Sequence, residues 1–248
     1  MKIRFLFAAA LLAGCQTTGA DAEPALPNAL VTQLTGSVFM AASLATDVAL
    51  NAADPDADPV CPAVGADNDD VVLDYGGACL PDSGITDVEI GGLVELTMPS
   101  SGGLFVGTST GLGFLNLPTV GEMSGDVVRS GPLTTSDFEW ETLEWTQNGA
   151  IRTLSALLRI EVDDSGYTLG AVGGTIEFDT GDPIQFALED ARMAAGGLGD
   201  CARPESGSLE FIRGGATASL DFTPEVATSG AIEVTFSDRE PEQLAICP

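Results

Sequence analysis

The sequence contains no histidine, and its only lysine is Lys2. The absence of histidine removes the commonest general base and the commonest metal ligand in proteins. Beyond Lys2 there is no lysine to form a Schiff base or to bind phosphate in a P-loop. Gly107–Gly111 matches the Gly-x-Ser-x-Gly pattern of a serine nucleophile. That pattern requires a strand-turn-helix setting and a histidine base, so we expect neither a catalytic serine there nor an enzyme.

Positive charge is scarce throughout the chain. After Cys15 the sequence has 37 acidic residues and seven arginines, which gives a net charge of about −30. Such a surface repels phosphate backbones and anionic lipid headgroups, so we expect neither nucleic-acid binding nor a polybasic membrane contact. The acidity has two explanations, general solubility and divalent-cation binding, of which solubility is the simpler.

The first fifteen residues have the pattern of an export signal. Lys2 and Arg4 precede an unbroken apolar run over Phe5–Leu12. That run is too short to cross a bilayer as a helix and is typical of a signal peptide. It ends in Leu12-Ala13-Gly14-Cys15, which resembles the lipobox of bacterial lipoproteins.

The lipobox resemblance implies that residues 1–14 are removed and that Cys15 is lipidated, which would anchor the protein to a membrane. The residue after Cys15 is Gln16. An Asp there resembles an inner-membrane retention signal, so we expect outer-membrane residence, on its periplasmic or its surface side. An ordinary secretory peptide, cut after Ala13 or Gly14, is the alternative.

Four cysteines remain after Cys15, an even number that predicts disulfides in an exported protein. They are Cys61, Cys79, Cys201 and Cys247. Three pairings can be drawn, and pairing between sequence neighbours, Cys61 with Cys79 and Cys201 with Cys247, is the simplest. A zinc site made of all four is the alternative, but the spacing contains no Cys-x-x-Cys unit.

The segment from Cys15 to Pro27 is predicted to be a polar tether, followed by one domain over residues 28–248. Asn28 is the predicted N-cap of a helix over Ala29–Ala52. Polar residues interrupt this helix, so we expect it to pack in a core rather than to cross a membrane. Its apolar stripe consists of Leu30, Leu34, Val38, Ala41, Leu44 and Val48.

From about Val71 the chain alternates in the manner of β-strands, with turn residues about every ten positions. Residues 163–166 and 179–182 are predicted hairpin turns. We expect eleven or twelve strands in a mainly β fold. The predicted architecture is a large antiparallel meander, forming a curved open sheet or half-barrel with the helix packed on it. A β-sandwich is the alternative, and Phe186–Met193 is predicted to be a short helix.

Four large apolar residues lie close together near the middle of the chain: Phe138, Trp140, Leu143 and Trp145. Regular alternation divides them between the two faces of a strand. Half of them are therefore expected in the core, and the others exposed or lining a cavity.

Two cysteine-containing blocks resemble a group of uncharacterised envelope lipoproteins of Gram-negative bacteria. The first block is Cys61-Pro62 with Val72–Cys79, and the second is Cys201–Ser208 with the last cysteine, Cys247. The resemblance supports the neighbour pairing of the cysteines and a β-rich fold. It implies no activity, cofactor or substrate.

An acidic segment precedes the first of these cysteines, with Asp54, Asp56 and Asp58 at alternate positions. Alternating carboxylates can wrap calcium, which takes six to eight oxygen ligands. An EF-hand starting at Asp54 would need glycine and glutamate where the chain has Pro59 and Gly65. A looser calcium site and a solvated acidic linker are the two interpretations. No other cofactor is expected.

Three functions are compatible with these patterns. The first is a non-catalytic, lipid-anchored envelope protein that binds an apolar ligand or a partner. The second is a structural or surface-display protein whose acidic face binds calcium or neighbouring proteins. The third is a carboxylate-based enzyme such as a glycosidase, although nothing in the sequence marks a catalytic pair. We favour them in that order.

Overall fold

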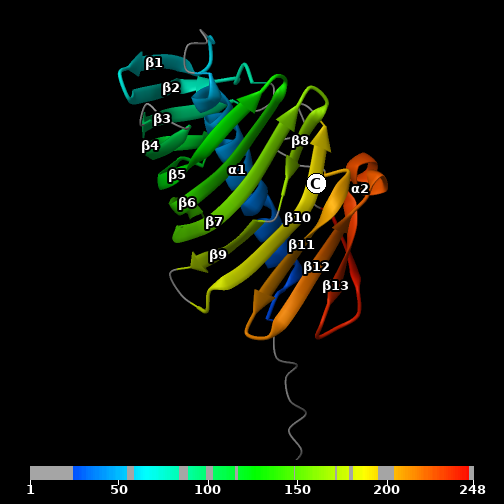
Figure 1. Ribbon diagram of the computed structural model, residues 1–248. Helices are drawn as coiled ribbons and strands as arrows, with labels where there is room; N and C mark the ends of the chain where they lie inside the picture. Colours follow the sequence, from blue (N-terminus) through cyan, green and yellow to red (C-terminus); the bar gives the residue numbers. More distant parts are fainter. Residues whose placement is uncertain are drawn as a thin grey trace, which may run out of the picture.

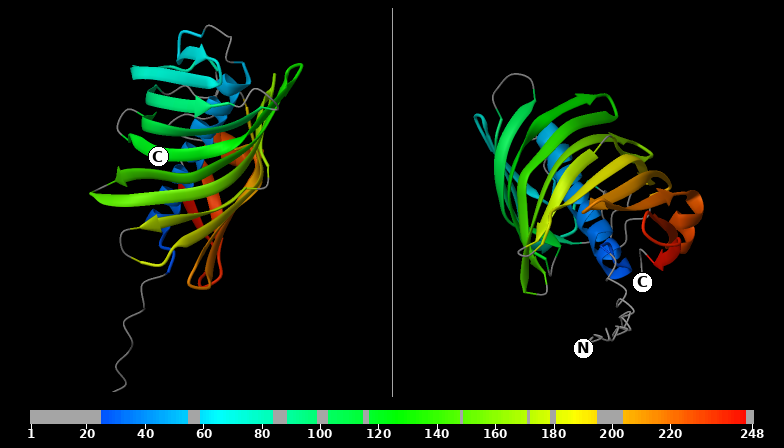
Figure 2. Two further views of the ribbon diagram at one scale, coloured as in Figure 1. Left: turned by 60° about the vertical axis from the view of Figure 1, so that its left-hand side comes forward. Right: turned by 90° about the horizontal axis from the view of Figure 1, so that it is seen from below.

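The computed structural model describes residues 25–54, 59–83, 89–98, 103–114, 117–147, 149–170, 172–178, 181–194 and 204–245. These residues form one sheet of fourteen strands that follows the chain almost in order. Each of its strand pairings is antiparallel. The sheet curves around helix α1 (Asn28–Ala53), which lies inside the curve (Figures 1 and 2). The predicted antiparallel meander with a packed N-terminal helix is confirmed.

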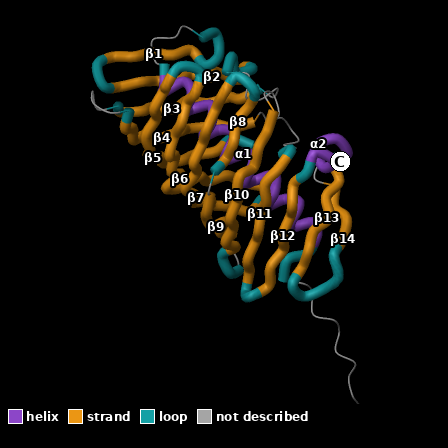
Figure 3. The backbone as a smooth tube through the Cα atoms, turned by 45° about the vertical axis from the view of Figure 1, so that its right-hand side comes forward, coloured by secondary structure: helices purple, strands orange, loops and turns teal. Residues whose placement is uncertain are grey.

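The strands lie in the order β1 to β8 and then β10 to β14, while β9 pairs with both β7 and β10. Strands β1 and β14 form the two edges of the sheet (Figure 3). A short helix, α2 (Pro224–Ser229), joins β12 to β13. The strands are β1 Ala63–Asp67, β2 Asp70–Cys79, β3 Ile90–Thr97, β4 Leu104–Phe114, β5 Thr119–Ser130, β6 Leu133–Gln147, β7 Ala150–Asp163, β8 Gly166–Leu169, β9 Val172–Phe178, β10 Ile184–Ala194, β11 Ser206–Arg213, β12 Ala216–Phe222, β13 Ala231–Phe236 and β14 Glu242–Ala245.

Helix α1 fills the inside of the curved sheet. Every residue from Ser37 to Ala49 is buried, so burial extends well beyond one apolar stripe. In length and composition α1 would suffice to cross a membrane, but 72% of its most apolar window is buried in this structure. It therefore acts as a core helix, as expected. Of the predicted stripe, Leu30 is half-buried, and the fully buried members are Leu34, Val38, Ala41, Leu44 and Val48.

The start of α1 differs from the prediction that Asn28 caps it. Pro27 is the N-cap residue, and its carbonyl oxygen accepts the amide N–H groups of Leu30 and Val31. The Asn28 side chain is used elsewhere, because its Nδ2 donates to Glu242 and its Oδ1 accepts from Arg239. Both ends of the described chain are thereby joined.

The four large residues of β6 all lie on the inner face, contrary to the prediction that alternation divides them. Phe138, Trp140 and Leu143 are fully buried, and Trp145 is 2% exposed. The reason is a β-bulge, because the register with β7 shifts between Trp140 and Leu143. One extra residue reverses the alternation, which returns the second pair to the core side.

The predicted helix over Phe186–Met193 is wrong, because these residues belong to strand β10. β10 pairs with β9, β8 and β11, so its backbone hydrogen bonds are made across the sheet. The hairpin turn at residues 163–166 is confirmed as the connection between β7 and β8. Residues 179 and 180 of the other predicted turn lie outside the described residues, although the strands on either side of that turn, β9 and β10, do pair.

Glycines allow close approach where β3 and β4 bend. Gly92 has φ +108, and a Cβ added there would lie 2.4 Å from the carbonyl carbon of Gly111. The register between the two strands shifts at the same place. Only glycine fits this position, and the irregular pairing bends the strands around α1.

Candidate functional site

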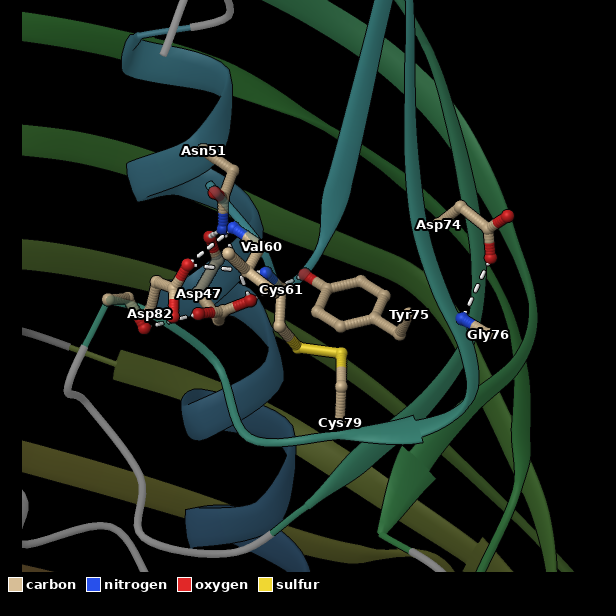
Figure 4. Close-up of a disulfide and its surroundings, with 10 residues drawn as sticks. Asp47, Asn51, Val60, Cys61, Asp74, Tyr75, Gly76, Cys79 and Asp82 are labelled. Carbon is tan, nitrogen blue, oxygen red and sulfur yellow. Dashed lines mark hydrogen bonds between the residues drawn. A yellow bond between two sulfur atoms is a disulfide. The ribbon is translucent and has the colours of Figure 1, made fainter. Parts of the chain in front are cut away.

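Asp47, in the last third of α1, is a fully buried carboxylate with its own set of donors. Tyr75 Oη of β2 donates to its Oδ2 and Ser83 Oγ to its Oδ1, each at 2.5 Å. Asn51 Nδ2 also donates to its Oδ2, at 3.3 Å (Figure 4). Burial raises the pKa of Asp47 above its usual value, while the hydrogen bonds from Ser83 and Tyr75 act in the opposite direction. Burial and the neighbouring carboxylate raise the pKa of Tyr75.

A disulfide lies beside this network. Cys61 and Cys79 are bonded, with their Cα atoms 5.9 Å apart, which confirms the first predicted pair (Figure 4). Asp82 accepts the backbone N–H groups of Val60 at 2.5 Å and Cys61 at 3.3 Å. The segments before and after β1 and β2 are thus tied together near the C-terminal end of α1. We call the Cys61–Cys79 disulfide and the Asp82 hydrogen bonds together the disulfide clamp, and its contacts indicate a structural role.

Several predicted site residues lie outside the described part of the chain. They are Cys15, Asp56, Asp58, Cys201 and Cys247. Of the proposed calcium ligands only Asp54 is described, and its carboxylate forms an ion pair with Arg129. Within the described ranges no group of three or more acidic or cysteine side chains is arranged to hold a metal ion.

A polar hollow of about 400 Å³ opens near the C-terminal end of α1. Asp54, Asp82, Arg129 and Asp163 contribute to its walls. Asp163 accepts hydrogen bonds from Ser165 and Arg192, which hold its pKa well below the usual range. Asp54 pairs with Arg129, Asp163 with Arg192, and Asp82 accepts backbone N–H groups, and these internal contacts favour a structural role for the hollow.

Two further hollows lie on the outer face of the sheet, where side chains point away from α1. The larger, of about 600 Å³, spans β2 to β6, and the smaller, of about 480 Å³, spans β4 to β7. Val106 lines both, so we call them together the outer groove. Its apolar surface includes Leu104, Val106 and Leu157, each more than half exposed. Its carboxylates are Asp70, Glu95, Glu122, Asp126, Asp137, Glu139 and Glu141.

The outer groove is not among the predicted sites, although the sequence contains a signal for it. Leu104-Phe105-Val106 and Leu157-Leu158 place apolar residues at consecutive positions of β4 and β7. Consecutive positions of a strand point to opposite faces, so at least one apolar side chain in each run must face outward. Phe105 and Leu158 are buried, and the other three are exposed. An apolar surface edged with carboxylates suits apolar and basic side chains of a peptide.

The Gly107–Gly111 pattern lies within strand β4 and forms no strand-to-helix turn. Ser109 faces the core and is 1% exposed. Among the described residues its hydroxyl has no hydrogen-bond partner. The pattern thus lacks the strand-to-helix turn that a nucleophile elbow requires.

Comparisons with protein-family models, with curated proteins and with solved structures found no match to this chain. Function must therefore be inferred from the fold and from the surfaces described above. Of these, the outer groove lies on the exposed face of the sheet, whereas the Asp47 network is a closed set of internal contacts.

Proposed function

We propose that this protein is a non-catalytic, lipid-anchored envelope protein that binds a basic segment of a partner protein in the outer groove. The position of α1 carries the proposal. Because the helix fills the inside of the curved sheet, the space where an enclosed apolar ligand would lie is occupied by side chains from Ser37 to Ala49. Binding is then expected on the outside, where the outer groove lies.

Charge supports a basic partner. The chain has a formal net charge of −28, and the outer groove adds local carboxylates around Val106. A strongly negative surface accelerates association with a positively charged segment and slows association with an acidic one. The exposed apolar side chains of Leu104 and Leu157 supply the contact area that charge alone does not.

The lipid anchor follows from the lipobox, and Cys15 is its attachment residue. Several acyl chains on one cysteine hold a protein far more durably than a single chain does. Replacing Cys15 with Ser should leave unprocessed precursor without acyl chains, as measured by mass spectrometry. Efficient acylation of the Cys15→Ser protein would refute the anchor.

Partner binding can be tested by photo-crosslinking in the native cells. A benzoylphenylalanine placed at Val106 should yield one discrete protein adduct, whereas the same group at Ile212 of β11, also exposed, should not. Glu95→Gln with Glu122→Gln should reduce the Val106 adduct, because these carboxylates line the groove. Equal yields of adduct from Val106 and Ile212 would exclude the groove as a binding site. A yield from Val106 that is unchanged in the variant with both glutamates replaced would exclude it too.

A further inference from the structure

The outer groove runs across the strands of the sheet rather than along one of them. Val106 of β4 is opposite Ser124 of β5 in the register of the two strands. Ser124 is in turn opposite Glu139 of β6, which is opposite Leu157 of β7. These four residues line the smaller hollow, and the larger hollow continues the groove to β2. A bound segment that follows the groove therefore lies at a steep angle to the strands.

The backbone of these strands is already hydrogen-bonded within the sheet. Each strand from β2 to β7 pairs with a neighbour on both sides, and the edges of the sheet are β1 and β14. A partner can add a strand only at a free edge, so the groove holds a segment through side chains alone. An α-helix satisfies its own N–H and C=O groups. An extended segment would instead turn unpaired backbone groups toward the apolar floor of the groove, which is costly.

A helix already crosses the same strands on their inner face. Helix α1 contacts β2, β4, β5, β6 and β7, and it runs across them (Figure 1). The strands bend around α1, so the outer face of the sheet is convex along the strands. A straight rod touches such a surface over the greatest length when it lies in the direction that does not curve. On the outer face that direction is parallel to α1.

Carboxylates border the groove on both sides of its apolar line. Glu122 and Asp126 of β5 lie two positions before and two positions after Ser124, so all three side chains point outward. The apolar side chains of Val106 and Leu157 lie along the row through Ser124, and each is more than half exposed. A helix with one apolar stripe and basic residues on both flanks of that stripe matches this arrangement.

An ion pair on the same face of the sheet shows how a cation can be bound there. Arg159 of β7 donates to both carboxylate oxygens of Asp137 in β6, at 2.7 and 3.0 Å. Within the described ranges Glu95, Glu122 and Glu139 form no such ion pair, and all three are exposed. Their carboxylates are open to lysine and arginine side chains of a partner.

We propose that the partner segment is an amphipathic basic α-helix that lies across β2 to β7, parallel to α1 and on the opposite face of the sheet. This inference rests on the proposed function and makes it specific, because it names the conformation and the charge pattern of the bound segment. Five strand spacings separate β2 from β7, a distance of about 24 Å. About 16 helical residues cover that distance, whereas about seven residues would cover it in an extended segment.

Photo-crosslinking from two positions measures the rise per residue of the bound segment. Benzoylphenylalanine at Val106, and in a second protein at Leu157, should crosslink to one partner in the native cells. Mass spectrometry then identifies the crosslinked partner residues. The two positions are three strand spacings apart, about 14 Å. We expect crosslinked residues about ten positions apart, as in a helix. A separation of about four would indicate an extended segment, which overturns the helix but leaves binding in the groove intact.

A synthetic peptide of the crosslinked segment provides a second measurement, with the full lipidated protein in detergent and detergent alone as the blank. Proline at the centre of the peptide should weaken binding at least tenfold, because proline breaks a helix, and alanine at the same position is the matched control. Equal affinities of the proline and alanine peptides would refute the helix. An adduct from Val106 without one from Leu157 would refute it too, since the segment would then not cross the strands. If neither position gives an adduct, the proposed function fails and this inference fails with it.

Discussion

Two buried charged side chains, Asp47 and Arg152, face the inside of the sheet near opposite ends of α1. Both oxygens of Asp47 accept hydrogen bonds, from Ser83 on one side and from Tyr75 and Asn51 on the other. Arg152 uses only Nη2, toward Gln33. The hydrogen bonds to Asp47 favour its ionised form and offset part of the cost of its burial. Arg152 lacks such compensation in the described part of the chain, so the two ends of α1 differ in how a buried charge is accommodated.

The largest expected effect tests whether α1 is packed equally at both ends. Leu44→Ala, near the Asp47 end, and Leu34→Ala, near the Arg152 end, should each lower the free energy of unfolding by about 2–5 kcal/mol. Both side chains are fully buried, so each truncation leaves a cavity. Denaturant unfolding measures the change, and Val120→Ala, at an exposed position, is the control. An unchanged stability for either leucine variant would mean that α1 is loose at that end.

The next effect concerns the disulfide, which lies only at the Asp47 end. Replacing both Cys61 and Cys79 with Ser should cost about 3 kcal/mol, because the bond closes a loop with a sequence separation of 18. Hydrogen exchange should then accelerate first in β1 and β2. If protection from hydrogen exchange instead falls first in β7 and β9, the disulfide does not act locally. It then does not distinguish the Asp47 end of α1 from the other end.

A smaller difference in stability is expected between variants of two buried tyrosines, Tyr75 and Tyr167. Tyr75→Phe removes a donor from the Asp47 carboxylate and should cost about 1–3 kcal/mol. Tyr167→Phe is the matched control, because its hydroxyl meets only the sulfur of Met193, a weak acceptor. Thermal unfolding of the two variants gives the ranking. Equal losses would show that the Asp47 network adds nothing beyond ordinary packing.

The smallest effect is a dependence on pH. The pKa of Asp47 is raised in the folded protein, so the native state binds a proton more tightly than the unfolded state does. The contribution of Asp47 to stability is then greatest below the unfolded carboxyl pKa of about 4 and declines as the pH rises toward the folded value. Asp47→Asn abolishes this decline. The melting temperature of the variant relative to the natural protein should increase from pH 4 to pH 7, and a constant difference would contradict the raised pKa.

The sequence predicted the helix and the antiparallel meander because both depend on local periodicity. It did not predict the inward position of Leu143 and Trp145, since a single bulge reverses the alternation of a strand. The predicted helix over Phe186–Met193 failed because pairing with three neighbouring strands outweighs local propensity in that segment.

Only some of the site residues could be predicted from the sequence. The Cys61–Cys79 pair was accessible to prediction, because short sequence separation favours pairing. Asp47 and Arg152 were not, because in the sequence Asp47 is one of several polar residues within the helix and Arg152 belongs to no recognisable motif. Burial is a property of the assembled sheet, so the sequence alone does not reveal whether a single charged residue is buried or forms an ion pair.

The contacts at the start of the domain have a mechanical consequence. The carbonyl oxygens of Ala25 and Leu26 accept hydrogen bonds from Arg213 and Arg239, and Asn28 bonds to Glu242. If Cys15 anchors the protein as we propose, a pulling force on the segment after it enters the described chain at this point. The force then acts on β11, on β14 and on the turn before β14 before it acts on α1. The hydrogen bonds of Ala25, Leu26 and Asn28 would therefore resist such a force before it reaches α1, so that the helix stays packed inside the sheet.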